Sequence, residues 1–140
     1  MKLWRELSSL AVLALIPAIM TGWLHPKHPE WSRTRIQVDQ VELNDVLNWK
    51  SPVLWVDARA TSTYQQKHIP EAVSLNESEW EQLLPGFLAT WKPGVRVVVY
   101  CNTQECDASQ AVAMRIKKEL NLTEIYVLHG GWSSWEQNHH

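Results

Sequence analysis

The chain has 140 residues, which is enough for one domain with a hydrophobic core. Its formal net charge of −2, and the lack of a basic stripe with interleaved aromatic residues, argue against a nucleic-acid partner. Two cysteines are too few for a disulfide scaffold or for zinc held by four cysteines, and we predict no metal site and no cofactor.

The N-terminal segment is predicted to be a membrane anchor. Residues 7–24 carry no charge and have about the length of a spanning helix. Trp4 and Trp23 stand near the two ends of this run, as interfacial anchors do. We therefore predict an uncleaved signal-anchor helix over residues 1–24, with the membrane as partner through residues 7–24. A cleaved signal peptide and a soluble amphipathic helix are the alternatives.

Residues 25–35 are predicted to be a juxtamembrane linker, because they are polar, contain two prolines and lack periodicity. His25 and His28 lie three positions apart, but no further ligands stand nearby, so we do not expect a metal there. A first helix most often leaves its short N-terminus inside. We therefore expect the folded domain on the non-cytoplasmic, periplasmic side, with a membrane-protein partner that the sequence does not identify.

From residue 36 the signals for strands and helices alternate. Strands are expected at residues 36–38, 53–56, 72–75, 95–100 and 125–128. Helices are expected at residues 41–49 and 60–67, from a cap at Asn76 or Ser78 to Leu84, from Ala108 to Leu120, and at 132–137. Pro85 and Gly86 are expected to break or bend the third helix. This alternation predicts an α/β fold with a parallel sheet and helices on both faces.

The most informative stretch is the apolar run that ends in Cys101. Residues 95–100 are short and rich in valine, as expected for a strand buried on both faces, and a helical pattern follows the loop. Cys101 therefore stands where a parallel strand leads to a helix, which is where open α/β sheets bind ligands. A thiolate should form more readily at such a position than in a free cysteine.

Four separated motifs resemble the rhodanese-like domain in order and approximate spacing over residues 36–137. They are residues 56–59 (Val-Asp-Ala-Arg), 68–72 (His-Ile-Pro-Glu-Ala), 99–101 (Val-Tyr-Cys) and 127–132 (Val-Leu-His-Gly-Gly-Trp). The resemblance implies a single three-layer domain with a five-stranded parallel sheet. It also implies that Cys101 takes up a sulfane sulfur as a persulfide and passes it to a thiol or another nucleophile.

The loop after Cys101 would bind the sulfur donor. Backbone N–H groups of successive loop residues can stabilise an anionic persulfide without a general base. These residues are Asn102, Thr103, Gln104, Glu105, Cys106 and Asp107. The family loop commonly contains a glycine and often a basic residue. Here Glu105 and Asp107 oppose thiolate formation and repel a dianion such as thiosulfate, so a persulfide or a neutral thiol carrier is favoured as the donor.

Cys106 lies five positions after Cys101 and is either a candidate resolving thiol or a small packing residue. A thiol-disulfide redox protein that uses both cysteines is therefore one alternative, although Cys-x-x-Cys would be the usual spacing. A rhodanese-like binding module without catalysis is another. A related cysteine phosphatase or arsenate reductase is excluded, because it would need arginine six positions after the nucleophile, where Asp107 stands.

Other polar residues are predicted to support the structure. Asp57 and Arg59 follow a buried strand and are expected to form an ion pair, and His68 is expected to bond a backbone group. His129 follows the last strand and could line the mouth of the pocket. Trp132 and Trp135 are expected to pack, and residues 138–140 to form a tail.

Overall fold

The computed structural model describes residues 38–102 and 107–139, which all belong to a compact unit spanning Ile36–His140. Over these two ranges, none of the helices has both the length and the apolar character needed to cross a membrane. The segment of residues 7–24 lies outside the described residues, as does the linker of residues 25–35. The anchor and its orientation therefore stay predictions.

The described residues contain a parallel sheet of five strands. The strands are β1 (Asp39–Val41), β2 (Val53–Asp57), β3 (Val73–Ser74), β4 (Arg96–Tyr100) and β5 (Ile125–Leu128). Their order is β1-β5-β4-β2-β3, so β4 occupies the centre and pairs with both β2 and β5. All four pairings are parallel, which confirms the predicted sheet.

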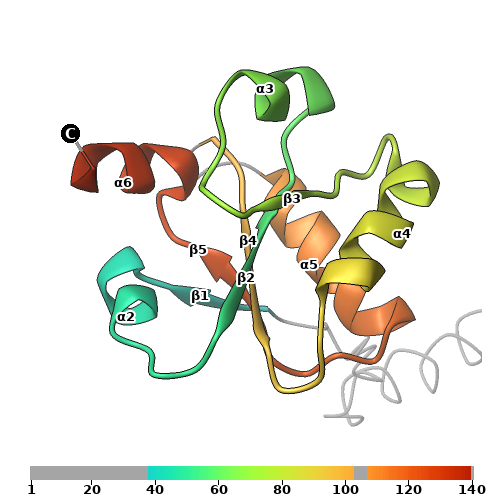
Figure 1. The fold of residues 1–140 in the computed structure, drawn as a ribbon, viewed down its shortest axis with the longest axis horizontal. Coiled ribbons are helices and arrows are strands. Elements are labelled where there is room, and N and C mark those ends of the chain that lie inside the picture. Colours follow the sequence, from blue (N-terminus) through green and yellow to red (C-terminus); the bar gives the residue numbers. More distant parts are fainter. Residues whose placement is uncertain (1–37, 103–106, 140) are drawn as a thin grey trace, which may run out of the picture. The chain divides into compact units, whose positions relative to one another are not determined.

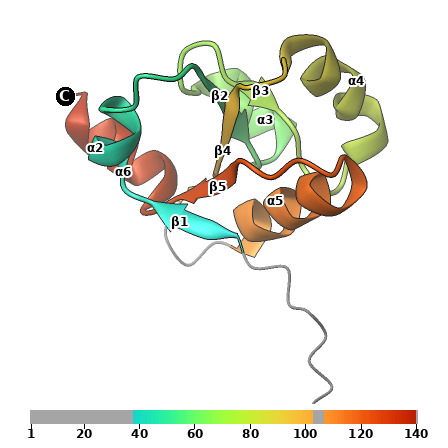
Figure 2. The same cartoon turned by 90° about the horizontal axis from the view of Figure 1, so that it is seen from below.

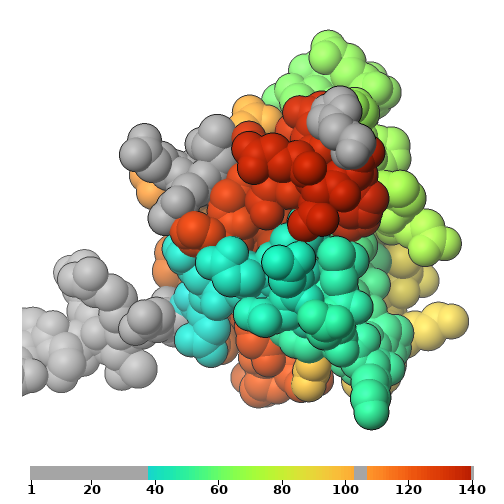
Figure 3. All heavy atoms as spheres, turned by 90° about the vertical axis from the view of Figure 1, so that its left-hand side faces the viewer, coloured from blue at the N-terminus to red at the C-terminus, as the bar shows by residue number. Residues whose placement is uncertain are grey.

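Helices cover both faces of the sheet (Figures 1 and 2). The helices are α2 (Leu43–Leu47), α3 (Thr61–Gln66), α4 (Trp80–Thr90), α5 (Asp107–Glu119) and α6 (Gly131–Asn138). Helices α4 and α5 lie on one face, and α2 and α6 on the other. Figure 3 shows α2 and α6 side by side on the surface, where the Asn138 amide donates a 3.4 Å hydrogen bond to the Asn44 side chain. The three-layer arrangement agrees with the prediction.

The two layers of helices explain why β4 is apolar throughout. Successive side chains of a strand point to opposite faces. Val97 and Val99 accordingly pack in the core beneath α4 and α5, whereas Val98 and Tyr100 pack in the core beneath α2 and α6. All four side chains are fully buried. A polar residue at any of these positions would be buried against one of the helical layers.

The first strand differs from its predicted position. β1 covers Asp39–Val41, whereas the apolar run at residues 36–38 was expected to form it. Pairing with β5 decides the position, because Val41 stands opposite Leu128 and Asp39 opposite Tyr126. Val38, at the edge of the described residues, is buried in the core without belonging to the strand.

Pro85 and Gly86 were expected to break or bend the third helix. Helix α4 continues through both residues to Thr90, so the predicted break is wrong, whereas the bend stays a prediction. A proline inside a helix costs about 3 kcal/mol through its missing N–H and its steric clash. Phe87 lies beyond the proline and is fully buried in the core, which contributes about 1.5–3 kcal/mol and favours the longer helix. At the other end, the Asn76 side chain accepts a 2.9 Å hydrogen bond from the backbone N–H of Glu79, just before the helix begins.

Candidate active site at the end of β4

Cys101 follows the last residue of the central strand and is 4% exposed. The topology therefore places its sulfur at the carboxyl edge of the sheet, the edge at which open parallel sheets bind ligands. Cys101 is disulfide-bonded in the structure. The sequence contains one other cysteine, Cys106, which lies outside the described residues.

Only the two ends of the predicted binding loop are described. Asn102 is exposed, and Asp107 is the exposed first residue of α5. The predicted positions Thr103, Gln104, Glu105 and Cys106 lie outside the described residues. The structure therefore shows how the chain enters and leaves this loop. The predicted anion-binding role of the loop stays a prediction.

The start of α6 holds the chain on both sides of the Cys101–Asn102 junction. The backbone N–H of Trp132 donates a 2.6 Å hydrogen bond to the carbonyl oxygen of Cys101. Ser133 donates two hydrogen bonds to the carbonyl oxygen of Asn102, from its backbone N–H at 3.1 Å and from its hydroxyl at 3.0 Å. A Cβ atom on Gly131 would lie 2.3 Å from the carbonyl oxygen of Cys101. This close approach therefore requires glycine.

The sequence predicted that Trp132 packs, but it gave no separate role to Gly130, Gly131 or Ser133. The signal that could have identified these residues is the pair of adjacent glycines directly before the helix predicted at residues 132–137. Both glycines have positive φ, 74° at Gly130 and 53° at Gly131, which few other residues adopt. Such a pair permits a close backbone approach, but the partner in that approach depends on the tertiary structure.

A buried polar network includes Tyr100, the residue directly before Cys101. Arg59 and Asp57 form an ion pair with a 2.6 Å contact, and the two side chains are 4% and 0% exposed. The Tyr100 hydroxyl donates a 2.7 Å hydrogen bond to Asp57 and accepts one of 3.1 Å from the backbone N–H of Ile69. Arg59 also donates a 2.7 Å hydrogen bond to the carbonyl oxygen of Lys67. The network thus ties the ends of β2 and β4 to the loop before β3.

Burial and charge shift the protonation equilibria of this network. Desolvation raises the pKa of Tyr100 far above its usual range, and the negative charge of Asp57 raises it further. For Arg59, burial alone would lower the pKa, but the hydrogen bonds and the charge of Asp57 outweigh burial and raise it. At neutral pH Tyr100 is therefore a neutral donor and Arg59 a cation. The Tyr100 hydroxyl and the Arg59 guanidinium therefore stabilise the structure and do not act as acids or bases in the reaction.

The Arg59 guanidinium also contacts two aromatic rings. Its central carbon lies 4.8 Å from the centre of the Trp132 ring and 5.5 Å from that of Tyr100. The Lys67 ammonium lies 5.5 Å from the Trp132 ring and forms a 3.0 Å ion pair with Glu136 of α6. Trp132 therefore packs, as predicted, and its contacts attach the start of α6 to the buried ion pair.

A second polar cluster stands between α3 and α4. The Thr61 hydroxyl and the Asn76 amide both donate hydrogen bonds to the carboxylate of Glu79. These bonds, that from Thr61 first, lower the pKa of Glu79. Asn76 is buried and also donates to the carbonyl oxygen of Arg59 at 3.3 Å. This cluster fixes the chain between β3 and α4 to the end of β2.

The two candidate histidines contact neighbours other than Cys101. Nδ1 of His68 lies 2.7 Å from the carbonyl oxygen of Tyr64, and the two rings stack with centres 4.0 Å apart. Nδ1 of His129 lies 3.0 Å from the carboxylate of Glu42, and its backbone N–H bonds the carbonyl oxygen of Val41. His68 thus bonds a backbone group, and His129 connects the end of β5 to the start of α2.

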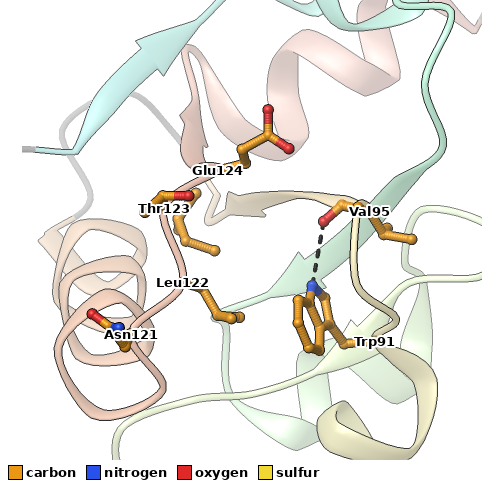
Figure 4. Close-up of a pocket in the computed structure, with 8 residues that line it drawn as sticks. Trp91, Val95, Asn121, Leu122, Thr123 and Glu124 are labelled. Atoms are coloured by element: carbon orange, nitrogen blue, oxygen red, sulfur yellow. Dashed lines mark hydrogen bonds between the residues drawn. The ribbon is translucent and has the colours of Figure 1, made fainter.

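A cavity of about 130 Å³ lies at the opposite edge of the sheet (Figure 4). Trp91, Val95 and residues 121–125 line it, just before β4 and β5 begin. The indole N–H of Trp91 donates a 3.3 Å hydrogen bond to the carbonyl oxygen of Val95. Because Cys101 stands at the other end of β4, this cavity is separate from the candidate active site. Within residues 38–102 and 107–139, no group of three metal-ligating side chains could hold a metal ion.

The chain belongs to the rhodanese-like domain family. A family model for the rhodanese-like domain matches residues 39–138, which is most of the sequence and all five strands. The resemblance inferred from the four motifs is therefore confirmed for family and fold. No protein with a curated function matches the chain.

Solved structures of three proteins share the fold. A Bacillus halodurans protein has 18% identity and a TM-score of 0.59, with 72% of this chain and 73% of that chain covered. A Saccharomyces cerevisiae protein, described as a homologue of single-domain rhodanese and of the Cdc25 phosphatase catalytic domain, has 20% identity and a TM-score of 0.56, with coverages of 71% and 80%. The rhodanese-like domain of an Anabaena protein has 23% identity and a TM-score of 0.54, with coverages of 73% and 76%. At these identities the likeness concerns the fold alone.

Proposed function

We propose that the protein is a sulfurtransferase in which Cys101 carries a sulfane sulfur. The observation that supports this most is the position of Cys101, at the carboxyl end of the central strand with its own carbonyl group held by α6. The buried network holds Tyr100, just before the nucleophile, and the hydrogen bonds from α6 hold the backbone of Cys101 and Asn102. A fixed backbone favours nucleophilic catalysis, because the reacting atom is held in place before the substrate arrives.

The transfer consists of two displacements that need no external oxidant. In the first, the Cys101 thiolate attacks the outer sulfur of a persulfide donor. A bond forms between the two sulfurs, the sulfur–sulfur bond of the donor breaks, and the donor thiolate leaves with the electron pair. In the second, an acceptor thiolate attacks the outer sulfur on Cys101 and restores the Cys101 thiolate. A disulfide at Cys101 must be reduced by a thiol before the first step.

A persulfide of a small thiol fits this site better than thiosulfate does. Asp107 begins α5, and the exposed carboxylate stands at the end of the loop through which the donor would enter. A carboxylate at that point repels a dianion but has less effect on a donor of lower charge. The phosphatase chemistry of some proteins with this fold is not favoured, because Asp107 occupies the position where a phosphate-binding arginine would be needed.

The disulfide at Cys101 favours a second candidate function, a thiol-disulfide redox protein. In that reaction the two cysteines of the chain, Cys101 and Cys106, would pass two electrons and two protons to a disulfide substrate. The chain would end with one internal disulfide and the substrate with two thiols. A binding module without catalysis is the third candidate.

Intact mass of the full chain separates the three functions. The protein is reduced, freed of reductant and incubated with cysteine persulfide or, in parallel, with thiosulfate. We expect a gain of one sulfur atom with cysteine persulfide that reductant reverses and that Cys101→Ser abolishes, while Cys106→Ser retains it. A loss of two hydrogens without a gain of sulfur would establish the redox function instead. No mass change with either donor would favour the binding module and refute both chemistries.

We also propose that residues 7–24 anchor the protein in a membrane with the domain on the periplasmic side, where a membrane protein could be its partner. The uncharged run and its flanking Trp4 and Trp23 support this proposal. In a bacterial host, the protein should stay with the membrane after alkaline extraction. A membrane-impermeant maleimide should label it in intact, reduced cells. Release into the alkaline supernatant would refute the anchor, and labelling only after lysis would refute the orientation.

A further inference from the structure

The start of α6 fixes the orientation of the two peptide groups that follow Cys101 along the chain. Two consecutive carbonyl oxygens, those of Cys101 and Asn102, accept hydrogen bonds from Trp132 and Ser133. Both oxygens therefore point toward α6. A carbonyl oxygen is the negative end of its peptide dipole, and the hydrogen bonds from α6 offset part of the negative charge on each of these two oxygens.

The same contacts orient the N–H groups. In a trans peptide the carbonyl oxygen and the following N–H point in opposite directions. Because the Cys101 carbonyl is directed at α6, the N–H of Asn102 is directed away from it. The positive end of the α6 dipole also lies within hydrogen-bond distance of this peptide group. Both effects favour a negative charge on the neighbouring sulfur.

We propose that Ser133 and Gly131 are positioning residues for sulfur transfer, because they hold the two peptide groups after Cys101 with their carbonyl oxygens hydrogen-bonded to α6 and so reduce the negative charge that a thiolate on Cys101 meets. This inference rests on the proposed sulfurtransferase function. Neither residue touches the reacting sulfur. Ser133 contributes its hydroxyl, and Gly131 contributes the missing Cβ that permits the close approach.

The chain offers a matched control for each residue. Ser134 is the next residue on α6, and its hydroxyl makes no hydrogen bond in the described part of the chain. Gly86 lies in α4, and an added Cβ there would meet nothing within 4 Å. Ser133→Ala is therefore compared with Ser134→Ala, and Gly131→Ala with Gly86→Ala. Ser133→Thr keeps a hydroxyl and serves as the rescue variant.

Two readouts are measured on the full chain. The first is the rate of sulfur transfer from cysteine persulfide to a small thiol in the reduced protein. The second is the pH profile of Cys101 alkylation by iodoacetamide in a Cys106→Ser background, where Cys101 is the sole thiol. Alkylation reports thiolate formation whether or not the protein transfers sulfur. A merely structural role for Ser133 would not move the midpoint of that profile.

We expect Ser133→Ala to move the alkylation midpoint to higher pH and to lower both rates at neutral pH about threefold, the effect of one modest hydrogen bond. Ser134→Ala should match the parent, and Ser133→Thr should restore it. Gly131→Ala should have a larger effect than Gly86→Ala. If Gly131→Ala does not fold, the serine variants still decide the question.

Identical alkylation profiles for Ser133→Ala and Ser134→Ala would overturn the positioning role. Absence of sulfur transfer in the parent would refute the proposed function alone, because the shift in the alkylation profile would still establish how α6 acts on Cys101.

Discussion

The hydroxyl of Tyr100 donates a 2.7 Å hydrogen bond to the carboxylate of Asp57, which lies 43 residues earlier in the chain. The two residues stand opposite each other in the register of β2 and β4, each as the last residue of its strand. Tyr100 directly precedes Cys101. The hydrogen bond therefore holds the end of β4, after which the chain continues to the candidate nucleophile Cys101.

Removal of the Tyr100 hydroxyl should destabilise the domain. Tyr100→Phe leaves the buried backbone N–H of Ile69 without its acceptor and removes one donor from Asp57. We expect the free energy of unfolding to fall by about 1–3 kcal/mol, measured by urea denaturation. The control is Tyr126→Phe on β5, because the Tyr126 hydroxyl makes no hydrogen bond within the described residues. A loss no larger than that of the control would contradict the role of the network.

Loss of the Arg59 cation should lower the free energy of unfolding more than loss of the Tyr100 hydroxyl does. Arg59→Leu leaves the fully buried carboxylate of Asp57 without its ion-pair partner. Breaking a buried pair from one side typically costs about 3–5 kcal/mol. Arg96→Leu is the comparison, because the Arg96 and Glu124 side chains are 31% and 48% exposed and such pairs contribute about 0–1 kcal/mol. Equal losses in urea denaturation would show that the buried ion pair contributes no more to stability than the exposed one.

The acid stability of the domain should depend on Glu79. Its folded pKa is lowered from the ordinary value of 4.5 by the hydrogen bonds from Thr61 and Asn76. A lowered pKa means that the stabilisation is fully present above the unfolded pKa and is lost as the pH falls through the folded pKa. Urea midpoints measured from about pH 6 to about pH 3 should fall less steeply below 4.5 in Glu79→Gln than in the parent.

Glu81→Gln provides the control for this pH series, because Glu81 lies two residues after Glu79, in the first turn of α4, with a side chain that is 84% exposed. Its profile should follow that of the parent. A parallel fall in all three proteins would mean that the Glu79 contacts do not form in solution.

The choice of sulfur donor should respond to the charge at Asp107. Asp107→Asn removes the carboxylate at the end of the Cys101 loop, and we expect the rate with thiosulfate to rise about two- to fivefold, since one exposed charge contributes about 1 kcal/mol or less. The rate with cysteine persulfide should change less. Asp45→Asn, which changes an acidic residue in the first turn of α2, should leave both rates unchanged. Equal effects on the two donors would exclude charge as the basis of selection.

Local patterns were sufficient to predict most of the fold. The strand at Ile125–Leu128 was predicted with its exact bounds, and the strand at Val53–Asp57 within one residue, because valine-rich runs between turn residues have few alternatives. The prediction of Cys101 at the end of the central strand also agrees with the structure. It required only that a buried strand end directly before the cysteine.

The errors occurred where distant contacts outweigh local preference. Burial of Phe87 carries α4 through Pro85, which local propensity alone would not allow. Pairing with β5 places β1 after the apolar residues that were expected to form it. In both cases the stabilising partner lies far away in the sequence, so its contribution cannot be seen in a short window.

The sequence by itself determined the order of strands and helices, the rhodanese-like motifs and the position of Cys101 after the central strand, because each depends on residues close together in the chain. Only the tertiary structure decided that Ser133 and Gly131 hold the carbonyl groups of Asn102 and Cys101. These contacts join segments about 30 residues apart. They exist because parallel pairing of β4 and β5 brings the carboxyl ends of both strands to one edge of the sheet.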